Sequence, residues 1–188
     1  MKRIVFVAAA LLGAGSLGAQ SPVLKPEIRP FAGVNIPLAD QRSLFNDAGM
    51  IGAQLALEIK PSLHVVGSFG WTASHSTYAV SDDNVNMFTY DVGLELGFVQ
   101  PLGGKWELKP FAGIGAGART YAFAGTTLSD KTCAAGYATA GTEFQITPWA
   151  FRVEGRGNAF CYKSPLAGVK SETRYDMGLS LGLAYHFR

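Results

Sequence analysis

Apolar and polar residues alternate along the last stretch of the chain, from Tyr175 to Phe187. Every second residue there is apolar and large, and the residues between them are polar or small. A period of two sustained over 13 residues predicts a β-strand with one apolar face and one polar face. Average strands have about 5–6 residues, so a strand of this length with an unbroken apolar face suits a wall that faces lipid.

The same alternation recurs in seven earlier stretches, which makes eight predicted strands. They cover residues 27–36, 51–60, 63–72, 88–98, 106–119, 134–146, 149–158 and 175–187. The connections after the second, fourth and sixth strands are short, and the connections after the first, third, fifth and seventh are longer and polar. An even strand number with alternately short and long connections predicts an all-β fold, an eight-stranded antiparallel up-and-down transmembrane β-barrel.

This pattern resembles the small eight-stranded outer-membrane β-barrel family, of the OmpA, OmpX and opacity-protein kind. The run Tyr175–Phe187 is similar to the C-terminal targeting strand of such barrels, although a single Arg188 follows the final aromatic residue. The resemblance implies a location in the cell outer membrane, contact with its lipids, and recognition of Tyr175–Phe187 by the barrel-assembly machinery. It does not name a ligand.

The first residues, Met1–Gln20, have the pattern of a secretory signal peptide. Lys2 and Arg3 precede the apolar run Ile4–Leu12, and small residues follow. The alternative is an N-terminal membrane helix, which needs about 20 apolar residues, whereas this run has nine. We therefore expect the signal peptide to be removed on export and residues 21–188 to form one barrel domain.

Charge and motifs exclude several classes of function. Two of the 16 basic residues lie in the signal peptide, which leaves 14 against 14 acidic residues. A net charge near zero argues against a nucleic-acid partner. The glycines around Gly115 lack the spacing of a phosphate-binding loop, and His64 and His186 have no third ligand motif. We therefore expect no cofactor and no metal, with the histidines hydrogen-bonded inside the barrel.

The polar faces of the predicted strands carry eight acidic and seven basic side chains. So many charges could not line the apolar pocket of a soluble lipocalin-type barrel, so lipid is expected outside. An eight-stranded barrel is just wide enough for side chains to fill, and unpaired buried charges are costly. We therefore predict a lumen filled by charge pairs, with a narrow open pore as the alternative. The predicted network comprises Glu58, Asp91, Glu95, Glu143, Arg152, Glu154, Arg156, Arg174 and Asp176.

No set of nucleophile, base and orienting residue is evident, so we expect no catalytic residues. The nearest candidate is His75-Ser76, followed by Asp82 and Asp83 in the second long connection. A lipid A-modifying hydrolase would need a serine activated by a histidine at the membrane edge, and adjacent loop residues make a poor triad. A structural or surface-interaction role, in adhesion or envelope integrity, is expected instead, with the hydrolase and the narrow pore as alternatives.

The only two cysteines, Cys133 and Cys161, are candidates for a disulfide. An exported chain meets an oxidising compartment, which favours the bond. The short turn at 147–148 sets a register in which Cys133 falls opposite Tyr162, one step away from Cys161. Alternation points Cys133 inward and Cys161 outward, so the bond requires a β-bulge near the loop. The alternative is two thiols.

Overall fold

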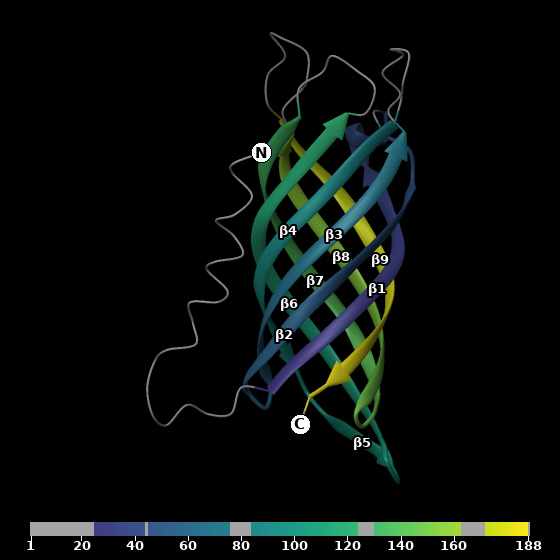
Figure 1. Cartoon of the computed structure of the whole chain (residues 1–188), viewed down its shortest axis with the longest axis vertical. Helices are drawn as coiled ribbons and strands as arrows, with labels where there is room; N and C mark the ends of the chain where they lie inside the picture. The colour runs from purple at the N-terminus through teal and green to yellow at the C-terminus, as the bar shows by residue number, and fades with distance from the viewer. Residues whose placement is uncertain (1–24, 44, 76–83, 124–129, 163–171, 188) are drawn as a thin grey trace.

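The computed structural model describes residues 25–43, 45–75, 84–123, 130–162 and 172–187. They form a closed antiparallel barrel of eight long strands, which confirms the predicted fold class (Figure 1). These strands are β1 (Lys25–Leu38), β2 (Ala48–Lys60), β3 (Leu63–His75), β4 (Asn84–Gly97), β6 (Trp106–Phe123), β7 (Lys131–Ile146), β8 (Trp149–Tyr162) and β9 (Glu172–His186). The predicted signal peptide, Met1–Gln20, lies outside the described residues.

Each long strand pairs with its neighbours along the chain, and β1 pairs with β9 to close the barrel. Short turns join β2 to β3 and β7 to β8, and we call this side the turn end of the barrel and the opposite side the loop end. Every strand extends two to four residues further toward the loop end than predicted. The backbone ladder continues there after the strict apolar alternation stops, because only the lipid-facing part of a strand needs an apolar outer face.

Two short elements interrupt the simple meander. The strand β5 (Gln100–Gly103) folds back on the first residues of β6 and projects beyond the barrel at the turn end (Figure 1). The 3-10 helix η2 (Ala39–Ser43) follows β1 at the loop end. Neither was predicted, because both lie in stretches without a regular apolar period.

No helix within the described ranges is both long and apolar enough to cross a membrane.

The outer surface of the barrel is apolar, as the alternation predicted. Large side chains that are about half exposed or more point outward from several strands, among them Ile51, Val92, Leu94, Ile114, Leu181 and Leu183. The inward positions between them are mostly buried and carry the polar and charged side chains. The barrel therefore has a polar interior and an apolar exterior, the reverse of a soluble barrel that holds an apolar ligand.

Glycines on the inner face make room for aromatic side chains in the lumen. A Cβ added at Gly115 would lie 2.4 Å from the ring of Tyr137, and one at Gly141 would lie 2.5 Å from the ring of Phe111. Such distances are far shorter than carbon contacts allow. At both positions an aromatic ring and a backbone carbonyl oxygen occupy the space that a side chain would need.

The lumen contains two unlike regions. Charged side chains fill the part nearer the turn end, and an apolar cluster fills the loop end. This cluster is formed by Phe45, Val85, Met87, Tyr121, Phe160 and Tyr162. A cavity of about 40 Å³ lies in the lumen and is lined by residues such as Asn35, Asp91, Arg119, Arg156 and Asn158.

Candidate functional site in the lumen

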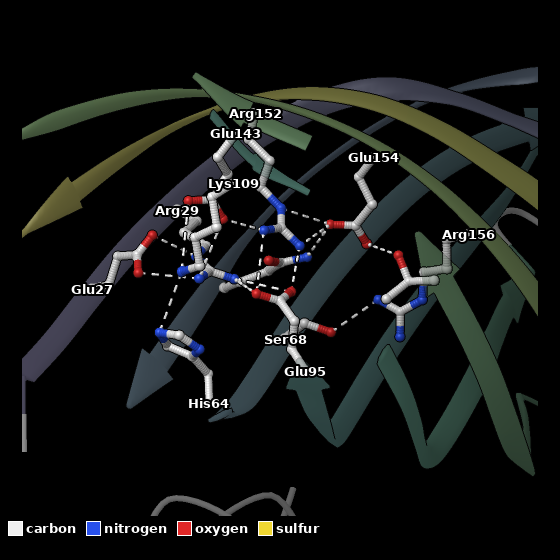
Figure 2. Close-up of polar contacts among 12 residues, drawn as sticks. Glu27, Arg29, His64, Ser68, Glu95, Lys109, Glu143, Arg152, Glu154 and Arg156 are labelled. Atoms are coloured by element: carbon white, nitrogen blue, oxygen red, sulfur yellow. Dashed lines mark hydrogen bonds and ion pairs between the residues drawn. The ribbon is translucent and has the colours of Figure 1, made fainter. Parts of the chain in front are cut away.

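Two arginines join four glutamates into one ion-pair network, which we call the lumen lattice: Glu27, Arg29, Glu95, Glu143, Arg152 and Glu154 (Figure 2). Each of these side chains is at most 5% exposed. Charges removed from water to this degree are tolerated only when they are paired and hydrogen-bonded.

Arg29 forms the first half of the lattice, from the β1 side of the lumen. Its Nε and Nη2 donate to the two carboxylate oxygens of Glu27, at 2.7 and 3.1 Å. Its Nη1 donates to Glu95 on β4 at 3.0 Å, and its Nη2 lies 3.4 Å from Oε1 of Glu143 on β7. One guanidinium therefore connects three strands across the lumen.

Arg152 forms the second half, from β8. Its Nη2 donates to Glu95 at 2.5 Å, its Nε donates to Glu154 at 3.0 Å, and its Nη1 donates to Glu143. The guanidinium also lies over the ring of Phe111, 3.4 Å from the ring centroid. Because Glu95 and Glu143 contact both arginines, the lattice is continuous across the barrel.

A group of possible metal ligands borders the lattice at the turn end. Ligand atoms of Glu27, Glu143 and His186 lie within 4.8 Å of one another. However, Arg29 lies against both carboxylates, and His186 Nδ1 is 3.4 Å from Glu27. The positive charge of Arg29 opposes a second cation at this point, so the geometry favours an ion-pair network over a metal centre.

Two further ion pairs lie nearer the loop end. Arg156 donates to Asp91 at 2.7 Å, and its guanidinium lies 3.6 Å from the ring centroid of Tyr137. Arg119 pairs with Asp176, which also accepts a hydrogen bond from Asn158 at 2.8 Å. Asp91, Arg156 and Arg119 line the 40 Å³ cavity, as does Asn158, the hydrogen-bond partner of Asp176.

Seven of the nine predicted network residues lie together in this lumen. They are Asp91, Glu95, Glu143, Arg152, Glu154, Arg156 and Asp176. Glu58 is half-buried near the turn end and forms no ion pair with a described residue. Arg174 pairs with the exposed Glu172 near the loop end, away from the lattice.

Sequence reasoning placed Glu27, Arg29 and Lys109 on the polar face but left them out of the network. Tilted and staggered strands in a closed barrel bring residues at different positions along their strands to one level. That stagger places Arg29, four residues after the start of β1, beside Glu95 on β4.

The predicted disulfide is not formed. Cys133 is a buried thiol on the inner face of β7, and Cys161 is a thiol on the outer face of β8. The register between these strands runs unbroken from Ile146 opposite Trp149 to Ala135 opposite Phe160. The register was predicted correctly, but the bulge that would have joined the two faces is absent from this ladder.

The predicted hydrolase candidate cannot be placed as a group. His75 is exposed at the end of β3, and Ser76, Asp82 and Asp83 lie outside the described residues. The two other histidines face charged groups: His64 Nε2 lies 3.4 Å from Lys109 Nζ, and His186 contacts Glu27.

The apolar cluster at the loop end was missed by sequence reasoning. Five of its residues, Val85, Met87, Tyr121, Phe160 and Tyr162, come from barrel strands, and we call them the mouth socket. The sixth, Phe45, comes from the connection between η2 and β2 and is 0% exposed. Continuing the alternation of the strands would have placed Tyr121, Phe160 and Tyr162 on the inner face. These positions lie beyond the predicted strand ends, so they were not considered.

The outer membrane protein beta-barrel domain family matches residues 5–187 of the chain. The chain belongs to this family. The family is one of outer-membrane proteins, so the apolar outer face of the barrel lies in outer-membrane lipid.

Solved barrels of this kind have a similar fold. Neisserial surface protein A is 12% identical, with a TM-score of 0.62, over 91% of this chain and 100% of that one. The attachment invasion locus protein Ail of Yersinia pestis is 16% identical (TM-score 0.49; 87% and 99% covered). The N-terminal barrel of Pseudomonas aeruginosa OprF is 14% identical (TM-score 0.48; 87% and 99% covered). At these identities the likeness concerns the fold alone, and no curated protein sequence matches the chain.

Proposed function

We propose that this protein is a non-catalytic barrel of the outer membrane with a structural or surface-interaction role, and that the lumen lattice seals its interior. The observation that carries the proposal is the sharing of Glu95 and Glu143 between Arg29 and Arg152. A permeating solute would have to separate these pairs. Breaking a buried pair leaves an uncompensated charge, which costs about 3–5 kcal/mol.

The space left in the lumen supports a sealed interior. One cavity of about 40 Å³ lies beside Arg119 and Arg156, and a second of about 10 Å³ lies beside Glu95 and Arg152. A single water needs about 10–15 Å³ of such space. These cavities have room for a few waters and are too small for a sugar.

The non-catalytic part of the proposal rests on the two histidines near the turn end, His64 and His186. His64 and His186 face Lys109 and Glu27 respectively, and neither hydrogen-bonds a described hydroxyl group. A serine or threonine nucleophile needs such a base within hydrogen-bond reach. Binding residues concentrate on loops of a rigid scaffold, so the contact surface of this barrel is its loop end.

Export and assembly complete the proposal. The segment Met1–Gln20 acts as a signal peptide and is removed, and Tyr175–Phe187 is the signal that the barrel-assembly machinery recognises. The second point is supported by the position of this run, because β9 pairs with both β8 and β1 and is therefore the strand that closes the barrel.

Planar-bilayer recording tests the seal. The refolded protein is expected to show little steady conductance, because the shared ion pairs close the lumen. The control is Arg174→Gln, which removes a charge outside the lattice and should leave the recording unchanged. Stable wild-type channels that pass small sugars would contradict the proposal and favour the narrow-pore alternative.

A further inference from the structure

The mouth socket is filled by a ring that does not belong to the barrel wall. The ring of Phe45 stacks on Tyr121 with a centroid distance of 5.6 Å and an interplanar angle of 21°. It meets Tyr162 edge-on at 6.2 Å and 77°. The walls of the socket are thus fixed by strands, and its occupant is supplied by a connection between η2 and β2.

The connecting segment has an unfavourable conformation of its own. Ala39 has a φ of 49°, in the left-handed region that residues with a Cβ avoid. The amide of Gln41 is completely buried, and neither its oxygen nor its nitrogen has a hydrogen-bond partner in the described structure. Burial of the Phe45 ring in the socket offsets part of these costs.

A few backbone and hydroxyl contacts also tether the segment. The N–H of Phe45 donates to the carbonyl of Gln41 at 3.1 Å, and the N–H of Asn46 donates to the carbonyl of His75 at 3.3 Å. The hydroxyl of Ser74 donates to the carbonyl of Asn46 at 3.1 Å. Two of these three contacts lie at Asn46, so the chain can pivot there while the Phe45 ring leaves the socket.

Unsatisfied donors lie just beneath the apolar walls. The Arg119 guanidinium is 4.3 Å from the ring centroid of Phe160, and its Nε–H has no partner among the described groups. Asn35 lines the same cavity as Arg119, and its buried Nδ2 also has none. Arg119 is already neutralised by Asp176, so the floor of the socket offers hydrogen-bond donors without a net charge.

We propose that the mouth socket binds small single-ring aromatic molecules that carry a neutral hydroxyl or carbonyl oxygen, and that Phe45 occupies it in the absence of such a molecule. The aromatic walls select a ring, and the donors of the floor select an oxygen. Phenol is the simplest member of the class. The inference goes beyond the sealed-barrel role and does not depend on it, because the ligand enters at the loop end and the lumen lattice below stays closed.

Because Phe45 and the ligand compete for the socket, the proposal predicts whether each variant raises or lowers the affinity for the ligand. The apparent affinity depends on how often the socket is vacant, so any change in the stability of the closed segment changes it. Phe45→Ala removes the competing ring and should tighten binding. Ala39→Gly relieves the left-handed φ of the closed segment and should weaken binding by about threefold.

Methionine methyl groups report on the socket directly. Met87 lies in the socket, Met50 lines the cavity beneath it, and Met177 points outward into lipid. Protein with ¹³C-labelled methionine methyls, in lipid nanodiscs, is titrated with 4-fluorophenol and followed by NMR. The Met87 signal is expected to shift saturably, whereas the Met177 signal should change only in proportion to the probe that partitions into lipid.

The variants make the titration decisive. Phe45→Ala should saturate at a lower probe concentration than wild type, and Ala39→Gly at about threefold higher. Arg42→Lys is the matched control on the same segment, because the Arg42 side chain is 63% exposed and the substitution keeps the charge that pairs with Asp47, and it should leave the curve unchanged. If Phe45→Ala does not fold, as judged by heat-dependent gel mobility, Phe45→Leu replaces it and should also tighten binding.

Three results would overturn the proposal. The first is the absence of a saturable Met87 shift in every variant. The second is a saturable shift in Phe45→Ala only, because the wild-type ring would then never vacate the socket. The third is an equal response to cyclohexanol, which has the same hydroxyl but no aromatic ring.

Discussion

At the scale of single residues, Arg152 illustrates how a barrel with a polar interior is held together. Its guanidinium contacts the carboxylates of Glu95, Glu143 and Glu154 and lies against Phe111. The arginine therefore supplies both charge and packing area. In most soluble domains apolar residues fill the interior. Here the apolar side chains face lipid, so charged side chains also have to fill the interior.

Replacement of Arg152 by Met is expected to destabilise the barrel by about 3–5 kcal/mol, because it leaves buried carboxylates without their partner. Urea-induced unfolding in lipid vesicles measures the change. Arg42→Met is the matched control, because both side chains of the Arg42–Asp47 pair are more than half exposed, and surface pairs contribute about 0–1 kcal/mol. Equal losses for the two variants would show that the lattice has no special role in stability.

The cysteines give a second test at this scale. Cys133 and Cys161 lie on opposite faces of the sheet, so we expect two thiols in the exported protein. Intact mass after denaturation and alkylation without a reductant should show two added alkyl groups. A protein that gains none until a reductant is added would contain the disulfide that this register disfavours.

At the scale of elements, the sequence was sufficient for the eight strands and their inward and outward faces. Period-two alternation is imposed by lipid on one face and side-chain packing on the other, so every lipid-crossing segment carries it. Alternation gives no prediction for Phe45, because no apolar period covers the stretch between β1 and β2. Its place in the mouth could not be predicted, since it depends on distant residues such as Tyr121 and Tyr162.

The glycines of the strands allow a test of inner-face packing. A Cβ at Gly141 would meet the Val153 carbonyl oxygen and the Phe111 ring, whereas one at Gly157 would meet nothing within 4 Å. Gly141→Ala should therefore cost about 1–3 kcal/mol through overpacking, and Gly157→Ala should change stability by less than about 0.5 kcal/mol. Urea unfolding midpoints compare them, and a larger loss for Gly157→Ala would contradict the packing described here.

At the scale of the whole molecule, the lumen is closed by two different devices. Shared ion pairs close it toward the turn end, and the apolar cluster around Phe45 closes it at the loop end. The first is costly to open, because separated charges would remain buried. The second depends on one ring from a connection, which a competing ring can replace. The two ends therefore suit different tasks, a permanent seal and a reversible contact.

Closure of the whole barrel depends on β9. Replacing Phe187, the aromatic residue that follows this strand, tests whether the run Tyr175–Phe187 is recognised during assembly or only stabilises the folded barrel. Phe187 and Phe144 are 41% and 40% exposed, so replacing either by Ser removes a similar apolar surface. Phe187 packs edge-on against Tyr185 at 4.8 Å, and its N–H donates to the carbonyl of Pro26.

If the assembly machinery recognises Tyr175–Phe187, Phe187→Ser should strongly reduce the heat-modifiable barrel found in outer membranes of cells, and Phe144→Ser should not. Both variants should still refold in detergent, because the backbone bond from residue 187 is kept. Equal amounts of the two variants in the membrane would show that this strand is required only to close the sheet.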